Sequence, residues 1–162
     1  MTRWLDDSEQ QVWRAFLGAN RLVFEQLDRE LQRDSAMPHA YYEILVRLSE
    51  APERALRMST LADASQSSRS RLSHAVARLE ANGWVRREVC ESDKRGQIAR
   101  LTDAGFAALA AAAPGHVEGV RRHVFDPLTP EQVRQLGEIS TALVTALLAD
   151  PETAECAEQV LA

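Results

Sequence analysis

The segment SSRSRLSHAVARL, residues 67–79, decides how the rest of the chain is interpreted. Its large apolar residues, Leu72, Val76 and Leu79, recur at the spacing of one helical face. The other face carries serine, arginine and histidine, and no acidic residue occurs before Glu80. Because an ordinary solvated helix face mixes charges of both signs, this pattern indicates a helix that binds an anionic partner.

A basic hairpin is predicted shortly after this helix. Residues 84–88 and 97–101 are typical of two short strands, and residues 92–96 form a charged turn between them. Residues 58–101 carry eight Lys/Arg against five Asp/Glu, a net charge of +3. Because the whole chain has a net charge of −5, the remaining residues together carry −8. Because the positive charge is confined to the middle, a cationic helix beside a basic hairpin indicates duplex DNA as the partner.

The composition is that of one globular domain. With 162 residues, of which 45% are hydrophobic, the chain can bury a single core, and we predict one domain over residues 1–162. No apolar stretch is long enough to span a bilayer and the N-terminus has no signal segment, so we expect a cytoplasmic protein without membrane contact. No hydrolase, phosphate-loop or zinc motif occurs, which disfavours an enzyme and predicts neither cofactor nor metal. Cys90 and Cys156 are too few for a disulfide framework.

Helical patterns precede the basic middle. A broad apolar stripe predicts a helix over residues 8–33, capped by Ser8 with Gln11 three positions later. This stripe is too hydrophobic for a solitary surface helix, so we expect it to pack against another chain. Pro38 is suited to the first turn of a second helix that ends near Glu50.

Two further long helices are predicted within residues 103–149. Thr102 is placed to cap the first of them, and Pro114 predicts a kink or a break inside it. Thr129, followed by proline and then glutamine at the third helical position, predicts the start of the second.

Several motifs resemble the MarR family of bacterial transcription regulators. The segment DKRG, residues 93–96, followed by Leu101-Thr102 and then Gly105, is similar to the wing signature of that family. The segment LEANGWV, residues 79–85, resembles the exit of its helix-turn-helix. The resemblance extends over residues 8–149.

The resemblance implies a mainly α fold with a small β-hairpin wing. Residues 38–101 would form a winged helix-turn-helix lobe, and residues 8–33 and 103–149 would supply the helices of a homodimer. Members of the family are triangular homodimers, and many repress transcription. Many also release DNA when a small aromatic acid or an oxidant acts on them. We therefore expect a repressor that binds a pseudo-palindromic operator.

The resemblance also assigns roles to residues. Residues 67–78 would lie in the major groove, and Arg95 would reach the adjacent minor groove while Asp93 braces its guanidinium. Ser68 and Arg78 are expected at phosphates. The predicted DNA-contacting set is Ser67, Ser68, Arg69, Ser70, Arg71, Ser73, His74, Arg78, Lys94 and Arg95. The alternative is a solvated surface, as in a winged-helix module that binds protein without binding DNA.

An effector cleft is predicted between the first two helices and the lobe. Aromatic walls and a cation for a carboxylate would come from Trp13, Arg14, Phe16, His39 and Tyr42. Trp13 and Phe16 could instead belong to the core of the dimer interface, and both interpretations stay open.

A cysteine and a pair of histidines offer two further candidate sites. Cys90 lies beside the predicted wing, so a redox-sensing regulator is an alternative, although Glu88 and Glu91 would raise the pKa of the thiol and so disfavour it. His116 and His123 lack a recognisable metal-ligand spacing, and we interpret them as surface histidines.

Overall fold

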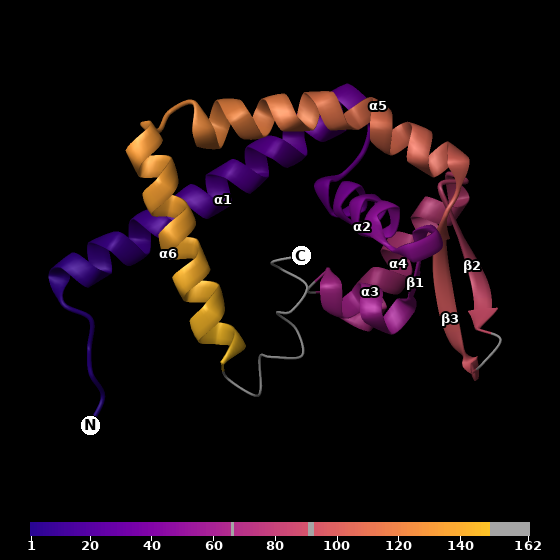
Figure 1. Ribbon diagram of the computed structural model, residues 1–162, viewed down its shortest axis with the longest axis horizontal. Helices are drawn as coiled ribbons and strands as arrows, with labels where there is room; N and C mark the ends of the chain where they lie inside the picture. Colours follow the sequence, from indigo (N-terminus) through magenta and orange to yellow (C-terminus); the bar gives the residue numbers. More distant parts are fainter. Residues whose placement is uncertain (66, 91–92, 150–162) are drawn as a thin grey trace.

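The computed structural model describes residues 1–65, 67–90 and 93–149, without the side chains of residues 90 and 93–95. The elements follow the order α1 (Asp7–Ser35), α2 (His39–Glu50), η1 (Pro52–Arg54), β1 (Ala55–Arg57), α3 (Met58–Ala64), α4 (Arg69–Ala81), β2 (Val85–Cys90), β3 (Asp93–Leu101), α5 (Asp103–Val120), η2 (Arg121–Phe125) and α6 (Pro130–Leu148). Figure 1 shows α2, α3, α4 and the strands gathered in one lobe, with α1 and α5 along its upper side. The predicted fold class, mainly α with a small hairpin wing, is confirmed.

The sheet is antiparallel, with β3 between β1 and β2. Between Val89 and Cys90 of β2, the paired residue on β3 jumps from Gln97 to Asp93, which marks a bulge. The predicted turn at residues 92–96 is therefore wrong from Asp93 onward, because this bulge lets the strand pairing continue beyond the alternating hydrophobic pattern.

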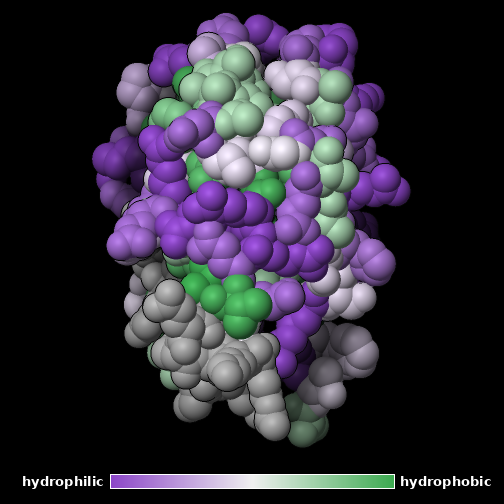
Figure 2. All heavy atoms as spheres, turned by 90° about the vertical axis from the view of Figure 1, so that its right-hand side faces the viewer, coloured by the Kyte–Doolittle hydropathy of each residue, from purple (hydrophilic) through white to green (hydrophobic). Residues whose placement is uncertain are grey.

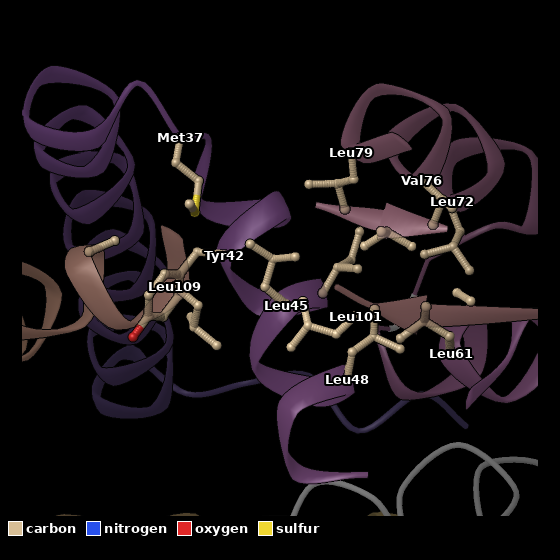
Figure 3. Packing of buried hydrophobic residues seen from close by; sticks show 14 of the residues in the cluster. Met37, Tyr42, Leu45, Leu48, Leu61, Leu72, Val76, Leu79, Leu101 and Leu109 are labelled. Carbon is tan, nitrogen blue, oxygen red and sulfur yellow. The ribbon is translucent and has the colours of Figure 1, made fainter. Parts of the chain in front are cut away.

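The core is built around α2. Figure 3 shows Leu45 of α2 between the apolar face of α4 on one side and Met37 and the α5 residue Leu109 on the other. The predicted inward face of α4 is confirmed, since its buried residues are Leu72, Val76 and Leu79. Burying one such side chain contributes about 1.5–3 kcal/mol, and this face therefore fixes α4 on the lobe.

The helix starts show which local signals decided the boundaries. The Glu9 backbone N–H donates to Asp6 Oδ1 at 2.8 Å, and the Asp6 N–H donates to Glu9 Oε2 at 2.9 Å. The predicted cap at Ser8 is wrong, because this earlier capping box also places a carboxylate at the positive end of the helix. The predicted caps Thr102 and Thr129 are confirmed.

α5 continues through Pro114 to Val120, so of the predicted kink or break at Pro114 the break is wrong and the kink stays a prediction. A proline removes one backbone donor, and here the contact of α5 with α1 and its alanine-rich sequence keep the helix continuous. The irregularity lies further on, at the π-helical turn η2, after which the chain turns into α6.

Large apolar side chains remain exposed on the end helices. α6 buries none of its residues within the chain, and it lies apart from the lobe, on the same side of it as the N-terminal half of α1 (Figure 1). The exposed residues of these two helices include Val12, Trp13, Phe16, Leu17, Leu22, Phe24, Leu136, Ile139, Leu143 and Leu147. Among the helices that the structure describes, none combines the length and hydropathy required to cross a membrane.

Candidate nucleic-acid interface

The start of α4 is set by two consecutive serines. The Ser67 backbone N–H donates to Ala62 O at 3.0 Å and closes the turn after α3, and the Ser68 hydroxyl accepts from the Arg71 N–H at 3.3 Å as the helix cap. α4 begins at Arg69, directly after its cap, and Ser67 lies in the turn before the helix. Both serines hold the first turn of α4 in place.

The outer face of α4 carries the other predicted DNA-contacting residues of this helix. Ser73 is half-buried, and the exposed residues are Arg69, Ser70, Arg71, His74 and Arg78. Within the described residues, the three arginine side chains form no ion pair or hydrogen bond. Their guanidinium groups are therefore available to an anionic partner.

Glu80, the first acidic residue of α4, does not weaken this positive face. Its Oε2 accepts from Arg87 Nε at 2.6 Å, and its Oε1 accepts from the Arg87 backbone N–H at 2.9 Å. Both bonds hold the pKa of the Glu80 carboxyl below its ordinary value, and the bond from the Arg87 side chain has the larger effect. The pair therefore neutralises the acid and joins the end of α4 to β2.

The wing is the hairpin formed by β2 and β3, next to α4. Figure 2, which views the molecule from the side of this hairpin, shows a band of hydrophilic residues across the middle of the surface. The side chains of Cys90, Asp93, Lys94 and Arg95 lie outside the described residues. Their predicted roles in oxidation, bracing and DNA contact stay predictions.

Arg100 fixes the root of the wing. Its Nη1 donates to Glu53 O at 2.8 Å, and its Nε donates to Glu88 Oε2 at 3.1 Å. The bond from Arg100 holds the pKa of the Glu88 carboxyl below its ordinary value. Glu53 has a left-handed φ of 52°, which orients its carbonyl toward the sheet root. Sequence analysis missed this contact because Glu53 and Arg100 are 47 residues apart.

The structure divides the predicted effector residues into two groups. Trp13 and Phe16 stack with their ring centroids 6.0 Å apart on the exposed N-terminal half of α1. Trp13 and Arg14 also line a shallow groove with Trp4. Trp13, Arg14 and Phe16 are not among the described residues that line the cavity of the other two predicted residues, His39 and Tyr42.

His39 and Tyr42 line a cavity of about 390 Å³ between α1, α2 and α5. The His116 ring lies 4.4 Å from that of Tyr42 and 5.4 Å from that of His39, measured between centroids. Burial, and then the proximity of His39, lowers the pKa of His116. Within the described residues, the buried His116 Nδ1 has no hydrogen-bond partner. The interpretation of His116 as a surface residue is wrong, because α5 packs against α1 and α2 and encloses it.

His123 is half-buried and contacts Glu30 of α1. The Glu30 carboxylate accepts from Gln26 Nε2 at 2.9 Å and lies 2.9 Å from His123 Nε2, while Arg122 Nη1 is 3.7 Å away. The hydrogen bond from Gln26, followed by that from His123, lowers the pKa of Glu30. Gly119 leaves room for this carboxylate, since a Cβ there would lie 2.7 Å from Glu30 Oε2. The cluster joins α1 to η2.

Comparisons with known proteins agree with this geometry. A model of the MarR family matches residues 37–96. The crystal structure of Sco3205, a MarR family transcriptional regulator from Streptomyces coelicolor in complex with DNA, is 55% identical, covers 96% of this chain and 97% of that one, and has a TM-score of 0.88. The crystal structure of AbsC, a MarR family transcriptional regulator from the same organism, is 45% identical, covers 92% of this chain and 100% of that one, and has a TM-score of 0.83.

A shorter match involves a curated regulator. The HTH-type transcriptional regulator PecS of Dickeya dadantii (strain 3937) is 34% identical over 82 residues, which cover 51% of this chain. The match spans about half of PecS, 49% of its length. These relatives are named as transcriptional regulators and not as enzymes.

Proposed function

Because the chain belongs to the MarR family of transcriptional regulators, we propose that it represses transcription by binding a pseudo-palindromic DNA operator as a homodimer in the cytoplasm. The observation that carries this proposal is the exposed face of α4, where Arg69, Arg71 and Arg78 lack an acidic partner within the described residues. The similar Sco3205 structure, determined in complex with DNA, supports the same partner for this chain.

In this proposal, the two α4 helices of a dimer bind successive major grooves about 34–36 Å apart on one side of the duplex. Arg69, Ser70, Arg71, Ser73 and His74 would then lie near base edges, and each good bidentate contact contributes about 1–3 kcal/mol of discrimination. The wing would place Arg95 in the adjacent minor groove, whose narrow form attracts arginine. Phosphate contacts would make the affinity fall steeply with salt.

The second copy of the chain would cover the apolar faces of α1 and α6. Ile139 and Leu143 of α6 are 58% and 49% exposed in the single chain, and Phe16 of α1 is 47% exposed. Such a continuous set of large apolar residues on projecting helices is typical of an interface rather than of a free surface. Two-fold pairing would also give the half-site spacing that the operator requires.

A small aromatic acid is the effector that the cavity between α1, α2 and α5 would accept. Phe24, His39, Tyr42 and His116 supply flat ring surfaces, and the buried His116 Nδ1 is a polar atom without a partner within the described residues. Because α1 carries proposed dimer contacts and α5 leads through η2 into α6, which carries the others, a ligand between α1 and α5 would change the relative position of the two α4 helices. The protein would then release DNA.

Selection from a random-sequence duplex pool, followed by footprinting, tests the central proposal. We expect a palindromic sequence whose half-site centres are one helical turn apart, and binding that weakens as salt rises. Arg95→Ala should weaken binding, and unchanged affinity would remove the wing from the mechanism. If wild-type protein shows no salt-dependent binding to any duplex, the alternative of a protein-interaction module is favoured.

The same footprint, repeated with phenolic acids, tests the effector. We expect a phenolic acid that binds in the cavity to release the protein from DNA. His116→Leu should abolish this response while leaving DNA binding intact. The redox alternative predicts instead that peroxide releases wild-type protein but not Cys90→Ser.

A further inference from the structure

A polar groove of about 360 Å³ lies between α4 and the root of the wing. Polar side chains from three separate parts of the chain line it: Arg69 and Ser73 of α4, Arg57 and Ser59 at the junction of β1 and α3, and Gln97 of β3. None of its described lining residues is acidic. The groove therefore concentrates hydrogen-bond donors and positive charge at one place.

The strand pairing brings these parts together. Arg57, the last residue of β1, pairs with Ile98 of β3 and so lies beside Gln97, the neighbour of Ile98 in the chain. Arg57, Ser59 and Gln97 are exposed. Because Arg69 and Ser73 belong both to the groove and to the cationic side of α4, the groove opens toward the partner of α4.

The geometry of duplex DNA determines what would pass over this groove. A major groove and the minor groove next to it are separated by one sugar–phosphate strand. If α4 lies in the first and the wing lies in the second, that strand has to cross between them. The groove occupies this position in the protein.

The chemistry of the groove fits a phosphodiester. A guanidinium binds phosphate oxygens through paired N–H groups, and serine hydroxyls and the glutamine amide donate single hydrogen bonds to the same oxygens. We propose that Arg57, assisted by Ser59 and Gln97, binds a backbone phosphate of the strand between the two grooves. This inference rests on the proposed function and extends the contact surface beyond the residues predicted from the sequence.

The test compares the salt dependence of binding for wild type, Arg57→Ala, Arg57→Lys and Gln97→Ala. The probes are the selected operator duplex and a scrambled duplex of equal length. Arg33→Ala is the matched control, because it removes the same charge from α1, outside the groove. Thermal unfolding verifies that each variant is folded.

One lost phosphate contact should make the plot of log K against log salt shallower by about 0.9, which corresponds to about eightfold weaker binding at about 0.1 M salt. We expect this loss for Arg57→Ala on both duplexes, a smaller loss for Gln97→Ala, and an unchanged slope for Arg57→Lys and Arg33→Ala. Equal weakening on the two duplexes identifies a phosphate contact, because phosphates carry no sequence information.

Three results would overturn the inference, and they differ in what else they affect. An unchanged slope for Arg57→Ala, with wild type still binding, refutes the phosphate site and leaves the proposed function standing. A loss confined to the operator duplex means that Arg57 reads a base and not a phosphate. Failure of the wild type to bind either duplex refutes the inference together with the proposed function.

Discussion

Replacing Gly105 with alanine tests how the wing is mounted on α5. Gly105 lies in the first turn of α5, where a Cβ would be 2.1 Å from Trp84 O and 2.8 Å from Leu101 Cδ1. Trp84 O cannot move away freely, because it accepts the Thr102 N–H at 3.0 Å and the Thr102 hydroxyl at 3.1 Å. The alanine methyl group would therefore push the start of β2 away from α5.

Three contributions determine how much Gly105→Ala changes the free energy of unfolding. Overpacking costs about 1–3 kcal/mol, and losing the two hydrogen bonds to Trp84 O costs about 1 kcal/mol each. The better helix propensity of alanine returns about 1 kcal/mol. We therefore expect Gly105→Ala to lower the free energy of unfolding by about 2–4 kcal/mol. The displaced wing should also weaken binding to the operator.

Urea unfolding at one fixed protomer concentration measures this loss, because the stability of a dimer depends on concentration. Gly115→Ala is the matched control on the same helix, since a Cβ there meets nothing within 4 Å. It should leave stability unchanged or raise it by up to about 1 kcal/mol. If Gly105→Ala is as stable as Gly115→Ala, the close approach of α5 to Trp84 does not constrain the wing as argued.

Two other predictions concern the end helices. Changing both Ile139 and Leu143 to aspartate should convert the dimer to monomers, as measured by sedimentation velocity, and abolish operator binding. The reason is that unpaired carboxylates buried in an interface cost on the order of several kcal/mol. A dimer that persists in this variant would place the interface elsewhere. Because folding lowers the pKa of Glu30, its ionised carboxylate stabilises the folded protein. This contribution is complete above the ordinary pKa of 4.5 and is lost as the pH falls through the lower pKa of Glu30 in the folded protein. Glu30→Gln should therefore be less stable than wild type at neutral pH and show a smaller decrease in acid, and parallel pH profiles of unfolding for the two proteins would contradict this.

Short-range patterns were reliable wherever a few neighbouring residues decide the structure. The buried face of α4 needs only helical spacing, and the caps at Thr102 and Thr129 need only a side chain within three residues of the N–H that it accepts. Gly83, which directly follows the last cap residue Asn82 of α4, has a left-handed φ of 72°, as is typical of a glycine at a helix end. At the N-terminus Asp6 and Ser8 are both suited to cap a helix, and Asp6 rather than Ser8 caps α1.

Part of the candidate interface could also be predicted from the chain alone. The helical periodicity that predicts a buried Leu72 also predicts that the arginines of α4 face outward, and they are exposed in the structure. Arg57 and Gln97 could not be predicted, because β1 contributes only three residues to the sheet and its pairing with β3 joins distant segments. No local pattern marks such a junction.

Local sequence patterns were enough to identify the parts of this protein: an amphipathic cationic helix, a basic hairpin and apolar end helices. Each of these depends on contacts between residues that are near one another in the chain. Three features emerged from the folded chain alone: α5 passes through Pro114 unbroken, His116 lines a cavity with His39 and Tyr42 but without Trp13, and Arg100 holds the root of the wing. These outcomes depend on packing between segments that are far apart in the chain, where the contacts with a second element outweigh local preference.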